Sequence, residues 1–173
     1  MWYKIIIYTI LMALLATVQI TLFGSFGDYF NSFNFLLAAL VILLFLVDFK
    51  WIVYFTILSG LILDIYSSLP FGIFLLSFFS AVSISDFLLS NFFTNRSFYS
   101  VIFLGLSAVL SFNLVFLITS GLFYLLGISD FYIDQGYWWK LFYQIINISL
   151  VLSALFFIIN SVSRKFKPNF IRS

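Results

Sequence analysis

The chain alternates between long apolar runs and short polar breaks. The apolar runs extend over Ile5 to Phe23, Phe35 to Val47, Trp51 to Tyr66, Phe71 to Phe93, Phe98 to Leu126 and Leu141 to Val162. A helix needs about 20 apolar residues to cross the hydrocarbon core of a bilayer, so the second and third runs are short for a full crossing. The pattern predicts an all-α, polytopic membrane bundle of about six transmembrane helices, forming a single domain over residues 1–173.

The two short runs admit two interpretations. Asp48-Phe49-Lys50 separates them, and the turn from Ser67 to Pro70 ends the second of the two, because proline cannot continue a helix. They form either two short spans or a hairpin that enters the membrane and returns. Hydropathy alone does not separate these alternatives.

The distribution of basic residues predicts the orientation. Six crossings place both termini on one side, and seven of the eight basic residues then share that side: Lys4, Lys50, Arg96, Arg164, Lys165, Lys167 and Arg172. Lys140 lies opposite, in a loop predicted over Gly127 to Lys140 that also holds Asp130, Asp134, Tyr137, Trp138 and Trp139. Basic residues concentrate in cytoplasmic loops, so we expect both termini in the cytoplasm.

Composition narrows the function. Of the 173 residues, 64% are hydrophobic and 8% are charged, which fits a protein whose partner is the lipid bilayer. Cysteine, histidine and glutamate are absent, which removes thiol nucleophiles, the usual zinc ligands and the usual general base. A net charge of +2 gives no basis for nucleic-acid binding. Composition therefore points to no cofactor or metal and leaves few candidates for catalysis.

Two aspartates, Asp64 and Asp86, fall within apolar runs. Placing an ionisable side chain in a membrane costs free energy, so each aspartate is a candidate for a specific role. A pair of touching aspartates could hydrolyse peptides. Asp86, however, lies 16 residues beyond Pro70, roughly 24 Å down the next helix, whereas Asp64 lies near the outer end of its own. The spacing argues against a catalytic pair and leaves Asp86 to reach an interface or cap the turn near Asn91.

Several residues around Asp64 have specific conformational roles. Gly60 lies one turn before Asp64 and leaves room for a neighbouring backbone. Ser67 and Ser68 can satisfy backbone donors where the helix ends, and Pro70 and Gly72 permit a tight return. The segment is either a structural turn or a surface that docks a partner or ligand.

Other polar and small residues mark helix contacts. Such residues hold membrane helices together because lipid is as apolar as leucine. They comprise Thr17, Gln19 and Thr21 in the first span, Ser77, Ala81 and Ser85 in the fourth, Ser107, Ser111 and Asn113 in the fifth, and Gln144, Asn147 and Ser149 in the last. Among them, Gln19, Thr21 and Asn113, together with Asp86, are secondary candidates for a functional site.

The motif Gly60, Asp64, Ser67, Pro70 and Gly72 resembles that of MreD, a small polytopic protein of the bacterial rod-shape system. The sequence from Gln19 to Phe23 resembles the glutamine-x-threonine-leucine of that family at the outer end of the first span. Phe33-Asn34 stands where many members have proline-aspartate. Size, span count and the basic tail are also similar.

The resemblance implies a non-enzymatic scaffold of the peptidoglycan elongation complex in the bacterial cytoplasmic membrane. Its expected partners are an MreC-like protein, a RodA-type glycosyltransferase and its class B transpeptidase. The family also looks like the substrate-binding components of energy-coupling-factor vitamin transporters. A small-molecule uptake component is therefore the alternative, with an outward-facing cavity lined by Asp64, Asn113, Gln144 or Asn147.

Overall fold

A computed structural model describes residues 2–23, 34–93, 98–128 and 136–165 of the chain. These residues form helices and their connections, without strands. The helices are α1 (Trp2–Val18), the π-helical turn η1 (Gln19–Phe23), α3 (Phe35–Leu46), α4 (Phe49–Tyr66), α5 (Ile73–Phe92), α6 (Phe98–Leu125) and α7 (Tyr137–Lys165). The predicted all-α class is confirmed.

Four of these helices, α4 to α7, are long and apolar enough to cross a membrane, and α1 and α3 are shorter apolar helices. Their bounds follow the apolar runs closely except at α7. That helix begins at Tyr137 and so includes Trp138 and Trp139, which were predicted to lie in a loop. The Lys140 amide donates to the Gly136 carbonyl at 3.0 Å, which starts the helix early. Asp130 and Asp134 lie outside the described residues.

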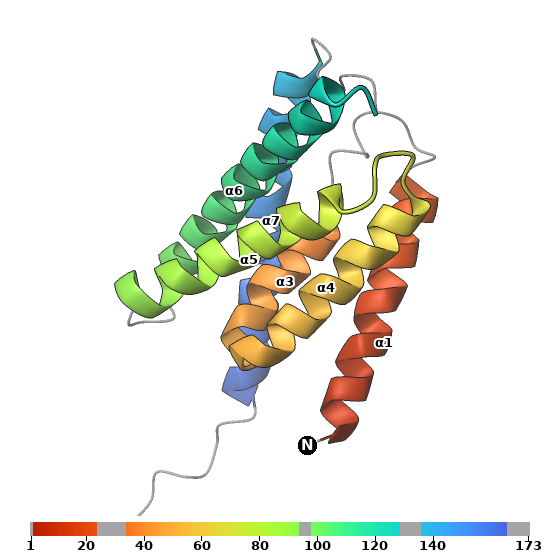
Figure 1. The fold of residues 1–173 in the computed structure, drawn as a ribbon. Helices are drawn as coiled ribbons and strands as arrows, with labels where there is room; N and C mark the ends of the chain where they lie inside the picture. The colour runs from red at the N-terminus through yellow and green to blue at the C-terminus, as the bar shows by residue number, and fades with distance from the viewer. Residues whose placement is uncertain (1, 24–33, 94–97, 129–135, 166–173) are drawn as a thin grey trace, which may run out of the picture.

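Successive helices run in opposite directions (Figure 1). One end of the bundle gathers the last residues of η1, α4 and α6 and the first residues of α3, α5 and α7; we call it the junction end, at the top of Figure 1. The first residues of α1 and the last residues of α7 lie at the opposite end.

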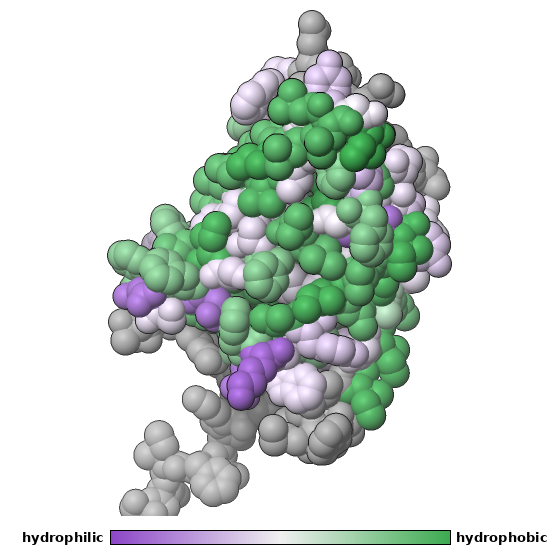
Figure 2. All heavy atoms as spheres, viewed as in Figure 1, coloured by the Kyte–Doolittle hydropathy of each residue, from purple (hydrophilic) through white to green (hydrophobic). Residues whose placement is uncertain are grey.

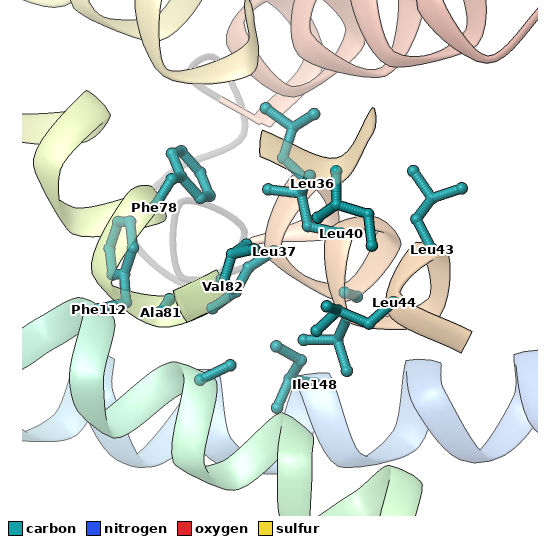
Figure 3. Close-up of a cluster of buried hydrophobic side chains, with 14 of the residues drawn as sticks. Leu36, Leu37, Leu40, Leu43, Leu44, Phe78, Ala81, Val82, Phe112 and Ile148 are labelled. Carbon is teal, nitrogen blue, oxygen red and sulfur yellow. The ribbon is translucent and has the colours of Figure 1, made fainter. Parts of the chain in front are cut away.

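Helix α3 forms the centre of the bundle. Leu36, Leu37, Leu40 and Val41 are fully buried, and the helix packs against α1, α4, α5, α6 and α7. Figure 3 shows its leucines converging with side chains of neighbouring helices, such as Phe78. A helix that is apolar on every side suits a position surrounded by other helices.

The outside of the bundle is also apolar. Large hydrophobic side chains on the described helices are exposed along their length, for example Ile10, Leu114 and Leu150. On the face drawn in Figure 2, hydrophobic residues cover most of the surface, and the most hydrophilic ones gather toward its lower part. This distribution supports a membrane protein whose exterior contacts lipid.

Small residues bring α5 against α6 as expected. Ser77, Ala81 and Ser85 are all buried, and the Ser85 hydroxyl donates to the Leu104 carbonyl of α6 at 3.5 Å. Their short side chains allow the two backbones to approach closely. The stripe therefore serves helix packing.

Candidate functional site

Asp64 caps the next helix along the chain. Its Oδ1 accepts the backbone N–H of Phe74 at 2.9 Å, and its Oδ2 accepts that of Leu75 at 3.1 Å. These amides belong to the first turn of α5, where a helix has no carbonyl partners of its own. The residue at the cap position of α5 is Gly72, which has no side chain to serve them. Asp64, buried at 4% exposure, supplies the missing acceptors from α4.

Two glycines make this capping geometry possible. A Cβ built on Gly60 would lie 2.6 Å from the Leu75 Cα, so only glycine lets α4 approach the first turn of α5 this closely. Gly72 has a φ of +102°, a conformation that other residues rarely adopt. The predicted purposes of both glycines, room for a backbone and a tight return, are confirmed.

Ser67 completes the end of α4. Its amide donates to the Leu63 carbonyl at 2.9 Å, and its hydroxyl donates to the Asp64 carbonyl at 3.2 Å. The side chain therefore serves a backbone acceptor, whereas the sequence suggested a donor. Pro70 lies between this end and Gly72, where α5 has yet to begin. We call this assembly of Gly60, Asp64, Ser67, Pro70 and Gly72 the second junction.

A first junction joins η1 to α3 in a similar way. The Gln19 side-chain oxygen Oε1 accepts the backbone N–H of Leu36 at 3.0 Å, and Asn34 Oδ1 accepts that of Leu37 at 3.1 Å. Gln19 Nε2 lies 3.5 Å from Asn34 Oδ1. Thr21 donates to the Thr17 carbonyl at 2.8 Å. In both junctions, a side chain at the end of one helix caps the first turn of the next.

A third polar group connects α6 to α7. Asn113 Nδ2 donates to Gln144 Oε1 at 2.9 Å and to the Val109 carbonyl at 2.8 Å. The Tyr137 hydroxyl donates to Asn113 Oδ1 at 2.9 Å. Asn113 and Gln144 are 7% and 9% exposed. Asn113 therefore fixes the register of α7 against α6.

The three groups surround a cavity of about 540 Å³ at the junction end. This volume lies in the range of small-molecule sites. The described residues that line it are Gln19, Ile20, Asn34, Leu63, Tyr66, Ser67, Ser68, Leu69, Phe74, Phe112, Asn113, Phe116, Tyr137, Lys140, Leu141 and Gln144. They come from η1, α4, α5, α6, α7 and the segments before α3 and after α4.

The structure brings some predicted site residues together and separates others. Gln19, Ser67, Asn113 and Gln144 line the cavity, whereas Asp64 is not part of the described lining and bonds through both oxygens to α5. Asn147 is outside the described lining.

Asp86 lies far from Asp64. It sits 11 residues beyond Leu75 on α5, roughly 16 Å along the helix, and is only partly buried. The structure shows no hydrogen bond from Asp86 to the turn near Asn91 within the described residues, where Asn91 itself donates to the Phe87 carbonyl at 2.9 Å. A shared proton between the two aspartates is incompatible with this separation. Nor do the described residues contain a group of three acidic or other metal-ligating side chains.

The sequence did not single out several residues of this site, among them Asn34, Tyr137 and Lys140. Asn34 carried a signal, because asparagine directly before an apolar run is a strong helix cap. Tyr137 and Lys140 were predicted to lie in a loop, so the sequence did not predict their position in the first turn of α7.

Comparisons of this chain with protein-family models, with characterised proteins and with solved structures find no match.

Proposed function

We propose that this protein is a non-enzymatic, MreD-like scaffold of the bacterial peptidoglycan elongation complex. One observation carries the proposal: the residues that resemble the MreD family, although scattered from Gln19 to Gly72, form two equivalent junctions at one end of the bundle. If these residues resembled the family only because both sequences are hydrophobic, there would be no reason for them to form the same kind of helix junction.

The departure from the family pattern also has a structural explanation. Asn34 stands where many family members have aspartate, and it accepts the Leu37 amide at the start of α3. Asparagine and aspartate are about equally good helix caps. The exchange therefore preserves the capping function.

The proposal includes the expected membrane arrangement. The chain crosses the bacterial cytoplasmic membrane six times, with α3 as a short crossing, and both termini lie in the cytoplasm. The basic residues of the described helices support this orientation, since Lys4, Lys50, Arg164 and Lys165 belong to helix ends opposite the junction end and Lys140 to the junction end. The junction end then faces the outside of the cell.

The surface around the second junction suits partner docking. Ile65, Tyr66 and Phe71 are 69%, 67% and 62% exposed beside the Pro70 turn. The two junctions hold this turn in a fixed shape, so apolar side chains are presented on a rigid support. We propose that an MreC-like protein binds here, alongside the RodA-type glycosyltransferase and its class B transpeptidase.

Depletion and co-purification test the scaffold role. Depletion should convert rods into spheres, and Ile65→Ala with Phe71→Ala should reduce recovery of the MreC-like partner without altering folding. Leu125→Ala is the matched control, because Leu125 is 79% exposed at the end of α6. Unchanged cell shape on depletion would contradict the scaffold role, and unchanged recovery would contradict docking at this turn.

A second candidate is a substrate-binding component of a small-molecule transporter. The cavity favours it, because Asn113 and Gln144 line a space of about 540 Å³ at the proposed outer end. A thermal-shift screen of the purified protein against vitamins tests this role. Absence of any stabilising compound would count against it.

A further inference from the structure

The cavity at the junction end is lined by amide side chains whose oxygens are hydrogen-bonded within the protein, whereas some of their nitrogens are not. Four amide side chains line it: Gln19, Asn34, Asn113 and Gln144. Each of their oxygens already accepts a hydrogen bond from within the protein, from Leu36 N, Leu37 N, the Tyr137 hydroxyl and Asn113 Nδ2 respectively. The junctions and the α6–α7 contact thus engage every amide oxygen of the lining in at least one internal hydrogen bond.

Two of the amide nitrogens remain available as hydrogen-bond donors. Gln144 is 9% exposed, and its Nε2 has no acceptor among the described residues, although its Oε1 is bonded to Asn113. Asn34 Nδ2 is also without an acceptor in the described part of the chain. Donors that line a cavity without a protein partner can serve an occupant that accepts hydrogen bonds. Lys140 adds a positively charged side chain to the same lining.

The opposite wall is apolar and aromatic. Phe74, Phe112 and Phe116 line the cavity, with the Phe112 and Phe116 rings stacked at 6.3 Å and an angle of 17°. This wall suits an apolar portion of a ligand.

We infer that the cavity binds an amphipathic anion: a carboxylate or phosphate, held by Gln144, Asn34 and Lys140, on an apolar body that packs against Phe74, Phe112 and Phe116. The shared chemistry fits an anionic phospholipid as well as a water-soluble amphipathic anion. Ligand binding in this cavity would be additional to the scaffold role, and it can be measured without an assay of cell shape.

Gln144→Glu is the most direct variant. It preserves the oxygen that accepts from Asn113 and replaces the amide donor with a second, negatively charged oxygen. Lys140→Gln removes the positive charge and provides a second variant. Asn147→Asp is the control, because it places an acid one turn further along α7, outside the described lining.

The test uses the full-length protein purified in dodecyl maltoside, with thermal stability measured against ligand concentration. One arm adds phosphatidylglycerol, with phosphatidylcholine as the zwitterionic reference. The other adds hexyl phosphate and hexanoate, with hexanol as the neutral reference. We expect saturable stabilisation by the anionic member of at least one arm. The arm that responds identifies a lipid or a soluble anion as the source.

Gln144→Glu should weaken this binding at least about tenfold, since it loses a hydrogen bond to a charged group and gains a like charge. Lys140→Gln should weaken it as well, and Asn147→Asp should leave it unchanged. Equal responses to anionic and reference compounds, or full binding by both Gln144→Glu and Lys140→Gln, would overturn the inference. If Gln144→Glu does not fold, the Lys140→Gln result decides.

Discussion

The two aspartates within the apolar helices have opposite surroundings. Both oxygens of Asp64 accept backbone amides of α5, whereas the described residues give Asp86 no such partner. A buried carboxylate is stable when hydrogen bonds replace its hydration. Asp64 is therefore part of the fold, and Asp86 is a side chain that the fold tolerates near the opposite end of α5.

Replacing Asp64 with asparagine tests this difference. Asparagine keeps one acceptor oxygen but turns an amino group toward the other backbone amide of α5. We expect Asp64→Asn to lower the free energy of unfolding by about 1.5–3 kcal/mol, the range for losing a hydrogen bond to a charged group. Asp86→Asn should change it far less. Denaturant titration in detergent measures both, and equal losses would contradict the capping role.

Gly60 provides a second test at this scale. Gly60→Ala should lower the free energy of unfolding by about 1–3 kcal/mol, because its Cβ would collide with the Leu75 backbone and separate α4 from α5. Gly121→Ala is the control. A Cβ there meets no atom within 4 Å, so its better helix propensity should leave stability equal or improved by up to about 1 kcal/mol. Thermal unfolding distinguishes the two, and a harmless Gly60→Ala would contradict close packing.

At the scale of elements, the two junctions follow one design. Gln19 precedes α3 and Asp64 precedes α5, and each caps the first turn of the helix that follows it. A helix end buried without such partners would leave its first amides unsatisfied. The junctions thus let two helices begin inside an apolar bundle.

Gln19→Leu should destabilise the first junction by about 1 kcal/mol, the usual value of a helix cap. Hydrogen exchange should accelerate at the Leu36 amide and leave the Phe74 amide protected. Combining Gln19→Leu with Asp64→Asn should give the sum of the two losses, because the two caps share no hydrogen-bonding partner. A marked departure from additivity would show that the junctions are coupled.

The positions of the elements were predictable because apolar runs define membrane helices. The bounds of α3 and α6 matched the runs to within one residue at each end. The partners of the polar side chains were less predictable. A glycine four residues before Asp64 indicated a close neighbour, but only the fold shows that the neighbour is the first turn of α5. The cavity was predicted in part, because Asn113 and Gln144 line it as the transporter alternative expected, whereas Asp64 and Asn147 do not.

At the scale of the whole molecule, orientation is the main prediction left to test. The chain has no cysteine, so single cysteines can be introduced without background. Ser68→Cys at the junction end should react with a membrane-impermeant maleimide applied to intact cells from which the cell wall and any outer membrane have been removed. Asp48→Cys, exposed between α3 and α4, should react only after lysis. The reverse pattern would invert the proposed topology.

The second junction has a consequence for the order in which the protein is made. Among the four long helices, α4 is the least apolar, and it carries Asp64. While α5 is still in the ribosome, that carboxylate, close to the end of α4, has no amides to bind, and this raises the cost of leaving the translocon. The first turn of α5 removes this barrier when it emerges. We expect α4 to wait at the translocon and enter the bilayer together with α5 as a preformed pair.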